Sequence, residues 1–323
     1  MPVDFPEGEW TRVLLTFTAD AGLYNDVPDK CGSNNPGWNP GGDPWDRTAS
    51  VYLVEDDCVD TGATCFGRLG NVELLRTITP FGTDDKRPPE GRGSGVVPAR
   101  TWTFDITPLV PLLEGRKYIG VFIGVFVSAG WDTYVRFDFS ERADEASPEP
   151  PADGVAKVFF HDGGNLAQSF PVTIPASATQ VKARVFTTGH GGNQFCDGGS
   201  RNGLSCAGGC PGGSCQNCDE FCHRENQILI NDVVRWSQVP WRDDCSPGSI
   251  FACQSWNACG WPSCTFSRAG WCPGYIACHK SGTCDQDIDF TQWLTPGATH
   301  QLRYNIPVLN GSWTKSVIVY WYE

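Results

Sequence analysis

The chain has 323 residues, more than a single hydrophobic core usually serves, so its length predicts two domains. Asp and Glu (37) outnumber Lys and Arg (24), and the net charge of -13, with no basic stretch, argues against nucleic acid as a partner. No window holds the roughly 18 to 20 uninterrupted apolar residues of a membrane-spanning helix, so no membrane partner is expected either.

Strand-like segments come first along the chain, each bounded by Gly, Pro, Asn or Asp. They cover residues 10–18, 48–55, 72–79, 101–106, 117–127 and 133–140. One short helical turn is expected at 108–113, and no segment sustains helical periodicity. These segments predict an antiparallel β-sandwich.

A charged, proline-rich stretch, ERADEASPEPPADG at 141–154, is typical of an interdomain linker. We therefore expect an N-terminal domain at 1–141, a linker at 142–154 and a C-terminal domain at 155–323. Further strands are predicted at 155–161, 180–188, 227–236, 300–306 and 315–322, with long loops at 189–226 and 240–285. The predicted fold class is all-β, with two adjacent antiparallel jelly-roll sandwiches and a site at their junction.

Sixteen cysteines, clustered in Gly/Pro/Ser-rich sequence, predict disulfides and an oxidising compartment, so the protein is expected to be secreted or periplasmic. Residues 1–10 lack a signal-peptide pattern, which implies that any export signal has been removed. Cys58 and Cys65 are expected to pair because they are close on a hairpin. A zinc site is the alternative for one dense group, but only one C-x2-C pair is present, so disulfides are favoured; the group is Cys206, Cys210, Cys215, Cys218 and Cys222, with His223 beside it.

Aromatic side chains are abundant, with 13 Trp, many of them in turn-rich sequence, and Trp faces stack well on sugar rings. Asp46 lies between Trp45 and Arg47 directly before a predicted strand, where a carboxylate can be aimed into a cleft; a surface salt bridge to Arg47 is the alternative. Glu220 lies between Cys218 and Cys222, which can constrain it.

Two further side chains stand in similar loop sequence. Arg268 precedes Trp271 and Cys272, where its guanidinium could bind a carbonyl or carboxylate oxygen. His190 follows a predicted strand. It could act as a general base or be a turn residue, and we favour the turn residue. The sequence lacks a nucleophile elbow, a phosphate loop and a His-rich copper site, so no cofactor and no metal are expected.

Four strings together resemble the peptide:N-glycosidase F family of bacterial exported amidases. They are WDRTASVYLVED (45–56), GHGGN with DGGSR (189–201), CDEFCHREN with ILIND (218–232) and RAGWCPG (268–274), and they occur in family order. The resemblance implies two eight-stranded jelly rolls. It also implies an activity: cleavage of the amide between Asn and the first N-acetylglucosamine of an N-glycan, which converts Asn to Asp.

Carried over by position, the resemblance makes Asp46 the principal catalytic carboxylate and Glu220 its partner. Substrate-binding roles would fall to Trp45, Arg47, His190, Arg268 and Trp271. The implied bridges are Cys218–Cys222 and Cys245–Cys272, and the implied partner is an N-glycosylated peptide or protein, with a monomer expected.

The chain departs from the family pattern at three places. Gly124 stands where the family has a further functional Glu, two Cys-rich insertions adjoin the expected cleft, and Cys31 alone remains of a Cys pair. The missing acid keeps open an alternative function, a lectin-like protein that binds N-glycans without cleaving them. A copper monooxygenase of similar architecture is disfavoured because the His and Met ligands are absent.

Overall fold

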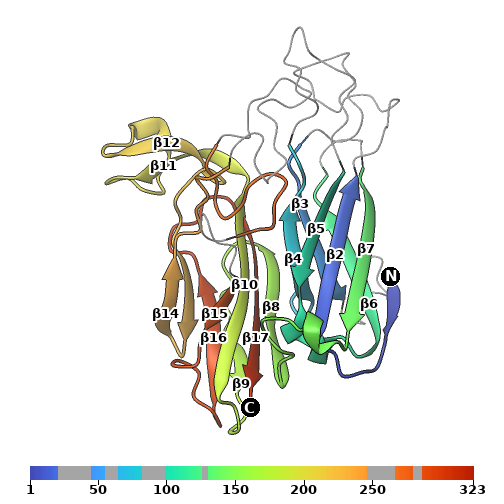
Figure 1. Ribbon diagram of the computed structural model, residues 1–323. Coiled ribbons are helices and arrows are strands. Elements are labelled where there is room, and N and C mark those ends of the chain that lie inside the picture. The colour runs from blue at the N-terminus through green and yellow to red at the C-terminus, as the bar shows by residue number, and fades with distance from the viewer. Residues whose placement is uncertain (21–44, 55–64, 82–98, 126–129, 246–265, 279–285) are drawn as a thin grey trace.

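The computed structural model describes residues 1–20, 45–54, 65–81, 99–125, 130–245, 266–278 and 286–323. Its regular structure is almost entirely β-strand, arranged as two sandwiches that stand side by side (Figure 1). The predicted all-β class and two-sandwich architecture are confirmed. Among the described residues, no helix is long and apolar enough to cross a membrane.

The first sandwich is built from seven strands and one 3-10 turn. Its two sheets have the orders β1-β6-β3-β4 and β5-β2-β7. The elements are β1 (Pro2–Phe5), β2 (Arg12–Asp20), β3 (Thr48–Val54), β4 (Val72–Ile78), β5 (Arg100–Asp105), η1 (Thr107–Leu112), β6 (Gly115–Ile123) and β7 (Asp132–Ser140).

The second sandwich has eight strands and carries a separate two-stranded hairpin. Its sheets have the orders β15-β10-β17-β8 and β14-β13-β16-β9, and β11 pairs with β12 alone. The strands are β8 (Gly154–Gly163), β9 (Phe170–Thr173), β10 (Gln180–His190), β11 (Gly192–Gly198), β12 (Gly213–Asp219), β13 (Asn226–Ile230), β14 (Val233–Gln238), β15 (Asp287–Asp289), β16 (Thr299–Asn305) and β17 (Ser312–Tyr322). Two further 3-10 turns are η2 (Ala143–Glu145) and η3 (Cys206–Gly208).

The strand orders identify both sandwiches as jelly rolls. Without the hairpin, the strands of the second sandwich follow the order of two interleaved Greek keys, in which only the consecutive strands β13 and β14 share a sheet. The seven strands of the first sandwich follow the same order if β1 is counted as the second of the eight jelly-roll strands. The first position, beside β7, is filled by no strand of the described residues, so this sandwich shows seven strands where eight were expected.

Several strands differ from the sequence-based expectation. The predicted strand at 227–236 is instead the hairpin β13–β14, because the chain turns at Asn231 and Asp232, whose φ angles are 51° and 63°. Strands β11 and β12 lie inside the expected loop 189–226, and the short strands β1, β9 and β15 were not predicted. The helical turn expected at 108–113 is present as η1, one residue earlier.

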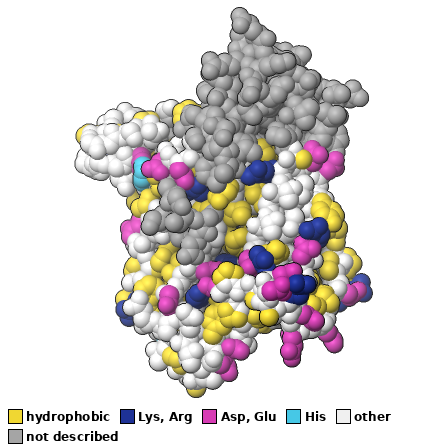
Figure 2. All heavy atoms as spheres, in the orientation of Figure 1, with side chains coloured by type: hydrophobic (Ala, Val, Ile, Leu, Met, Phe, Trp, Pro, Cys, Tyr) yellow, Lys and Arg dark blue, Asp and Glu magenta, His cyan; other side chains and the backbone are white. Residues whose placement is uncertain are grey.

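The connection between the sandwiches follows η2 along the lower side of the molecule (Figure 1). Acidic side chains gather on the lower part of this face (Figure 2), in keeping with the net charge of -13. The segment makes specific contacts: Ser147 N donates to Thr11 O at 3.0 Å and Asp153 N donates to Trp321 O at 2.9 Å. The division into domains at 142–154 stays a prediction.

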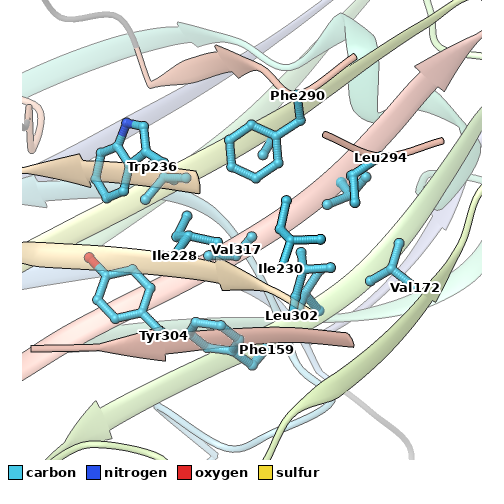
Figure 3. Packing of buried hydrophobic residues seen from close by; sticks show 14 of the residues in the cluster. Phe159, Val172, Ile228, Ile230, Trp236, Phe290, Leu294, Leu302, Tyr304 and Val317 are labelled. Carbon is cyan, nitrogen blue, oxygen red and sulfur yellow. The ribbon is translucent and has the colours of Figure 1, made fainter. Parts of the chain in front are cut away.

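Each sandwich is filled by alternating apolar side chains from its two inner faces. In the second sandwich, Phe159, Ile228, Leu302 and Val317 meet in one cluster, and Figure 3 shows Tyr304 and Trp236 at its side. The cluster of the first sandwich extends to Ile318 and Tyr320 of β17, which belong to the second. The two halves therefore share apolar contacts, which fixes their relative position.

A buried polar cluster also joins the halves. Glu73 and Arg76 of β4 are both fully buried and form a two-point ion pair. Glu73 also accepts a hydrogen bond from Ser316 Oγ at 2.6 Å, and Arg76 Nη1 donates to Thr188 Oγ1 at 3.2 Å and to Thr314 O at 2.5 Å. Part of the hydrogen bonding of each charge therefore comes from the other sandwich and is present only while the two sandwiches stay docked.

Replacing Arg76 by Met is expected to destabilise the protein by about 3–5 kcal/mol, because Glu73 would be left as a buried charge without its partner. Denaturant unfolding with disulfides kept oxidised measures this. Arg136→Met is the control, since the Arg136–Asp138 ion pair is exposed and its loss should cost at most about 1 kcal/mol. Equal losses in the two variants would contradict the account of the junction.

Candidate active site

Asp46 is held in place by the end of the neighbouring strand. Thr79 Oγ1 donates to Trp45 O at 3.1 Å and accepts from Arg47 N at 2.7 Å, and Thr79 N donates to Arg47 O at 2.8 Å. These three bonds clamp the residues on both sides of Asp46 just before β3. The Asp46 side chain is thereby directed toward the second sandwich, where it meets Arg268.

Arg268 begins a loop that crosses from the second sandwich onto the first. Ile78 N donates to Tyr275 O at 2.9 Å and Ala277 N donates to Arg76 O at 2.9 Å, so the loop continues the sheet at the edge of β4. At its start, Arg268 pairs with Arg242 through two backbone hydrogen bonds of 2.8 and 2.9 Å. The Cys245–Cys272 disulfide closes the same loop.

Glu220 directly follows the hairpin β11–β12 and lies within the small ring closed by Cys218–Cys222. The Ala269 N–H donates to Glu220 O at 3.0 Å, which ties this ring to the Arg268 loop. The close approach requires Gly189, since a Cβ there would lie 2.9 Å from the Ala269 Cβ. Gly189, the first residue of the GHGGN string, thus allows the Arg268 loop to meet the ring that carries Glu220.

The acids near Glu220 have different environments. Asp219 is fully buried and bonded to Arg224 Nε at 2.9 Å and Trp313 Nε1 at 3.0 Å. Glu225 is exposed and accepts from Ser237. Of these three acids, only Glu220 faces Arg268.

One guanidinium brings the two candidate carboxylates together. Arg268 is fully buried; its Nη2 donates to Asp46 Oδ2 at 3.1 Å, and its Nε lies 3.5 Å from Glu220 Oε1. The Asp46 and Glu220 side chains are 12% and 23% exposed, so substrate can reach both. The pKa of Glu220 is raised to about 7, mainly by loss of hydration; Arg268 opposes this rise and the Asp46 charge adds to it.

Trp271 and His190 pack behind this group. Trp271 is 2% exposed, its Nε1 donates to Gly189 O at 2.9 Å, and the Arg268 guanidinium lies over its ring at 4.6 Å. A ring so buried has no face for a sugar, so Trp271 positions Arg268 instead of contacting substrate. His190 stacks on Trp271 at 5.6 Å between ring centroids.

His190 lies at the end of β10, with Thr188 Oγ1 2.7 Å and Thr48 Oγ1 3.2 Å from its Nε2. Burial and the charge of Arg76 lower the pKa of His190 to about 3. The imidazole is therefore neutral at physiological pH and too weak a base to accept a proton in catalysis. The sequence favoured a turn residue at this position, whereas the structure has His190 as the last residue of β10; its role stays a prediction.

Trp45 is half-buried against Phe81, Cys245 and Cys272, and this packing orients the residue before Asp46. Arg47 fixes the other side of Asp46 through its backbone hydrogen bonds to Thr79.

Two aromatic residues near Arg268 were missed by sequence reasoning. Phe221 lies under the Arg268 guanidinium at 5.3 Å and contacts Phe266, which is 47% exposed. The position of Phe221 between Cys218 and Cys222 was the available signal.

The cysteines of the zinc alternative are all oxidised. Bridges join Cys196 to Cys210, Cys206 to Cys215 and Cys218 to Cys222, so these sulfurs are not available as thiolate ligands. Cys245–Cys272, implied by the family resemblance, is also present. Cys65 is disulfide-bonded, but Cys58 and Cys31 lie outside the described residues, and the Cys58–Cys65 pairing stays a prediction.

Changing Asp46 to Asn is expected to lower the pKa of Glu220, because it removes the neighbouring negative charge, and Arg268→Gln is expected to raise that pKa. Carbon-13 NMR of labelled Glu side chains follows the titration, with Glu225→Gln as the control that leaves it unchanged.

The same titration has a consequence for stability. Since the pKa of Glu220 is higher in the folded state, the wild type should lose stability relative to Glu220→Gln as pH rises from about 4.5 to about 7. A constant difference over that range would contradict the raised pKa.

Comparisons with known proteins agree with this architecture. Residues 33–139 match the model of the N-terminal domain of peptide-N-glycosidase F, and residues 210–320 match that of its C-terminal domain. The search of curated proteins found no match.

Solved structures with the same fold include PNGF-II, at 18% identity and a TM-score of 0.65, and recombinant peptide:N-glycanase F, at 20% and 0.60. A further match is PNGase F from Flavobacterium meningosepticum, described as a glycosylasparaginase, at 19% and 0.58. All three alignments cover 100% of this chain; they cover 59% of PNGF-II and 88% of each of the others, so the chain spans less than two thirds of PNGF-II. The two domain models, matched in order along one chain of two jelly rolls, place this protein in the peptide-N-glycosidase F family.

Proposed function

We propose that the protein is an exported glycoamidase that hydrolyses the side-chain amide bond of glycosylated Asn, between the carbonyl carbon and the nitrogen that carries the first N-acetylglucosamine, in N-glycosylated peptides or proteins. The observation that carries this proposal is the contact of Asp46 and Glu220 with one buried guanidinium, Arg268. The disulfides are typical of an oxidising compartment, which supports export. The chemistry requires only one copy of the chain, in agreement with the expected monomer.

The two carboxyl groups suit two different proton transfers. Asp46, ion-paired with Arg268, accepts a proton from water as the water oxygen attacks the amide carbonyl carbon. Glu220 is protonated below about pH 7 and donates its proton to the amide nitrogen as the carbon–nitrogen bond breaks. The products are an Asp residue and a glycosylamine.

Arg268 serves this reaction electrostatically. Its guanidinium is fully buried against Trp271 and Phe221, so it acts without touching substrate, through its electric field on the negative charge that develops on the carbonyl oxygen. A preformed cation in a site of low polarity stabilises such charge without rearrangement. The exposed ring of Phe266 offers an apolar surface beside the same group, suited to a sugar or peptide side chain.

Mass spectrometry of a defined N-glycopeptide after incubation is expected to show free glycan and a peptide with Asp in place of Asn. Asp46→Asn and Glu220→Gln should each reduce kcat/KM by about 10²–10⁴-fold, the usual contribution of a positioned proton-transfer group. Glu225→Gln, in the same segment but directed to solvent, is the matched control and should retain full activity.

The pH profile adds an independent readout. The wild-type kcat/KM should fall as pH rises through about 7, because Glu220 loses the proton it donates, and this limb should vanish in Glu220→Gln. An intact glycopeptide at every pH, with binding retained, would overturn the amidase proposal in favour of the lectin-like alternative.

Gly124 bears on that alternative. It follows β6, donates its N–H to Thr48 O at 3.0 Å, and a Cβ there would come no closer than 3.5 Å to the Phe122 ring. The position where the family resemblance places an acid therefore accepts a Cβ without a clash. Its lack of a side chain reflects the sequence of this chain and not a steric requirement.

Gly124→Glu is expected to change the free energy of unfolding by less than about 1 kcal/mol and to increase kcat/KM for the glycopeptide. The control is Gly120→Ala on the same strand, where a Cβ would lie 2.4 Å from the Tyr52 ring and should cost about 1–3 kcal/mol. If Gly124→Glu folds normally but kcat/KM stays the same or falls, the acid has no role in this chain.

A further inference from the structure

A pocket opens at the junction of the sandwiches, separate from the Asp46–Glu220 group. It has a volume of about 330 Å³, within the range of small-molecule sites. Three parts of the chain line it. The first sandwich contributes Arg12, Phe104, Asp105 and Pro108, the connection contributes Ser147, Pro148 and Glu149, and the second sandwich contributes Arg184, Gln286 and Asp287.

The pocket walls are fixed by hydrogen bonds between these parts. Arg184 is 3% exposed and binds Asp287 at two points, at 2.8 and 2.7 Å, and its Nη1 donates to Asp105 O at 3.3 Å. Glu149 accepts from Lys182 and from Tyr320 OH at 3.2 Å. A site preformed in this way binds without the entropy cost of ordering its own side chains.

Arg12 carries a polar atom that the fold does not satisfy. Its Nε is buried and has no hydrogen-bond acceptor among the described residues, and the nearby Asp105 Oδ2 lies 3.7 Å away, which is too far for a hydrogen bond. The side chain as a whole is 39% exposed, so a ligand can reach it. A ligand hydroxyl that bridges these two groups would accept from Arg12 Nε and donate to Asp105 Oδ2 once the Arg12 side chain turns its Nε toward the pocket.

The charges around the pocket select the class of ligand. Two guanidinium groups, Arg12 and Arg184, face three carboxylates, Asp105, Asp287 and Glu149, so the pocket has both donors and acceptors and no excess positive charge for an anion. Basic and acidic side chains likewise alternate across the middle of the face in Figure 2. Phe104 and two prolines supply an apolar surface. Neutral polyhydroxyl compounds match this combination, because their hydroxyls both donate and accept and their ring faces are apolar.

We infer that this pocket is a saccharide-binding site for a neutral mono- or disaccharide unit. It lies outside the candidate active site: Arg184 precedes His190 by six residues on β10, which corresponds to about 20 Å along the strand. The site acts by binding alone and does not require that the protein cleave glycans.

Ligand-observed NMR titrations with N-acetylglucosamine and with methyl α-mannoside test the inference. At least one sugar should bind saturably to the wild type, and Arg12→Gln should weaken that binding roughly tenfold, as expected for a lost charged hydrogen-bond donor. Arg136→Gln is the matched control, since Arg136 is also paired with an Asp and lies on the neighbouring strand β7 but does not line the pocket. Binding should also be insensitive to added salt, because the ligand is neutral.

The outcomes separate this inference from the proposed function. Binding that is retained in Asp46→Asn but weakened in Arg12→Gln supports the pocket, whether or not glycopeptide is hydrolysed. Binding lost in Asp46→Asn but unchanged in Arg12→Gln would place the sugar in the candidate active site and overturn the inference. The absence of saturable binding, or displacement of the sugar by inorganic phosphate with strong salt dependence, would overturn it as well.

Discussion

The buried guanidinium of Arg268 is the interaction on which the candidate site depends. It binds Asp46 from the first sandwich and lies beside Glu220 from the second, so the two acids share a site only while the halves are docked. A buried cation needs such partners, because removal of charge from water is costly unless the charge is paired. The aromatic rings of Trp271 and Phe221 hold the planar group in one orientation.

The docking itself rests on a second polar cluster, at Glu73 and Arg76. This ion pair is completed by Thr188, Thr314 and Ser316 of the other sandwich, and the Arg268 loop extends the sheet edge next to it. The strands that carry the cluster also lead into the site, since β10 ends at His190. Assembly of the candidate site therefore depends on the packing of the two sandwiches against each other.

The disulfides stabilise the parts of the site that have no sheet to support them. Cys218–Cys222 closes the turn that bears Glu220, and Cys245–Cys272 closes the loop that bears Arg268. Long loops are costly to order, and cross-links reduce the conformational freedom of the unfolded chain. The Asp219 carboxylate adds a fixed point beneath Glu220 through Arg224 and Trp313. Rigid loops of this kind can place charged groups with the accuracy that catalysis needs.

The sequence by itself determined the all-β class, most of the longer strands and the two halves, because period-two patterns and turn residues are local signals. It also singled out Asp46, Glu220 and Arg268, through strings that lie on constrained loops. It missed β11 and β12, whose Gly- and Cys-rich strands carry no alternating apolar pattern, and it merged β13 with β14 across the turn at Asn231. Only the tertiary structure decided that Asp219 is a structural acid, that Trp271 supports Arg268 from a buried position, and that Arg12 meets Asp105 at a pocket between the halves. These roles depend on burial and on contacts between residues far apart in the chain, which no local pattern encodes.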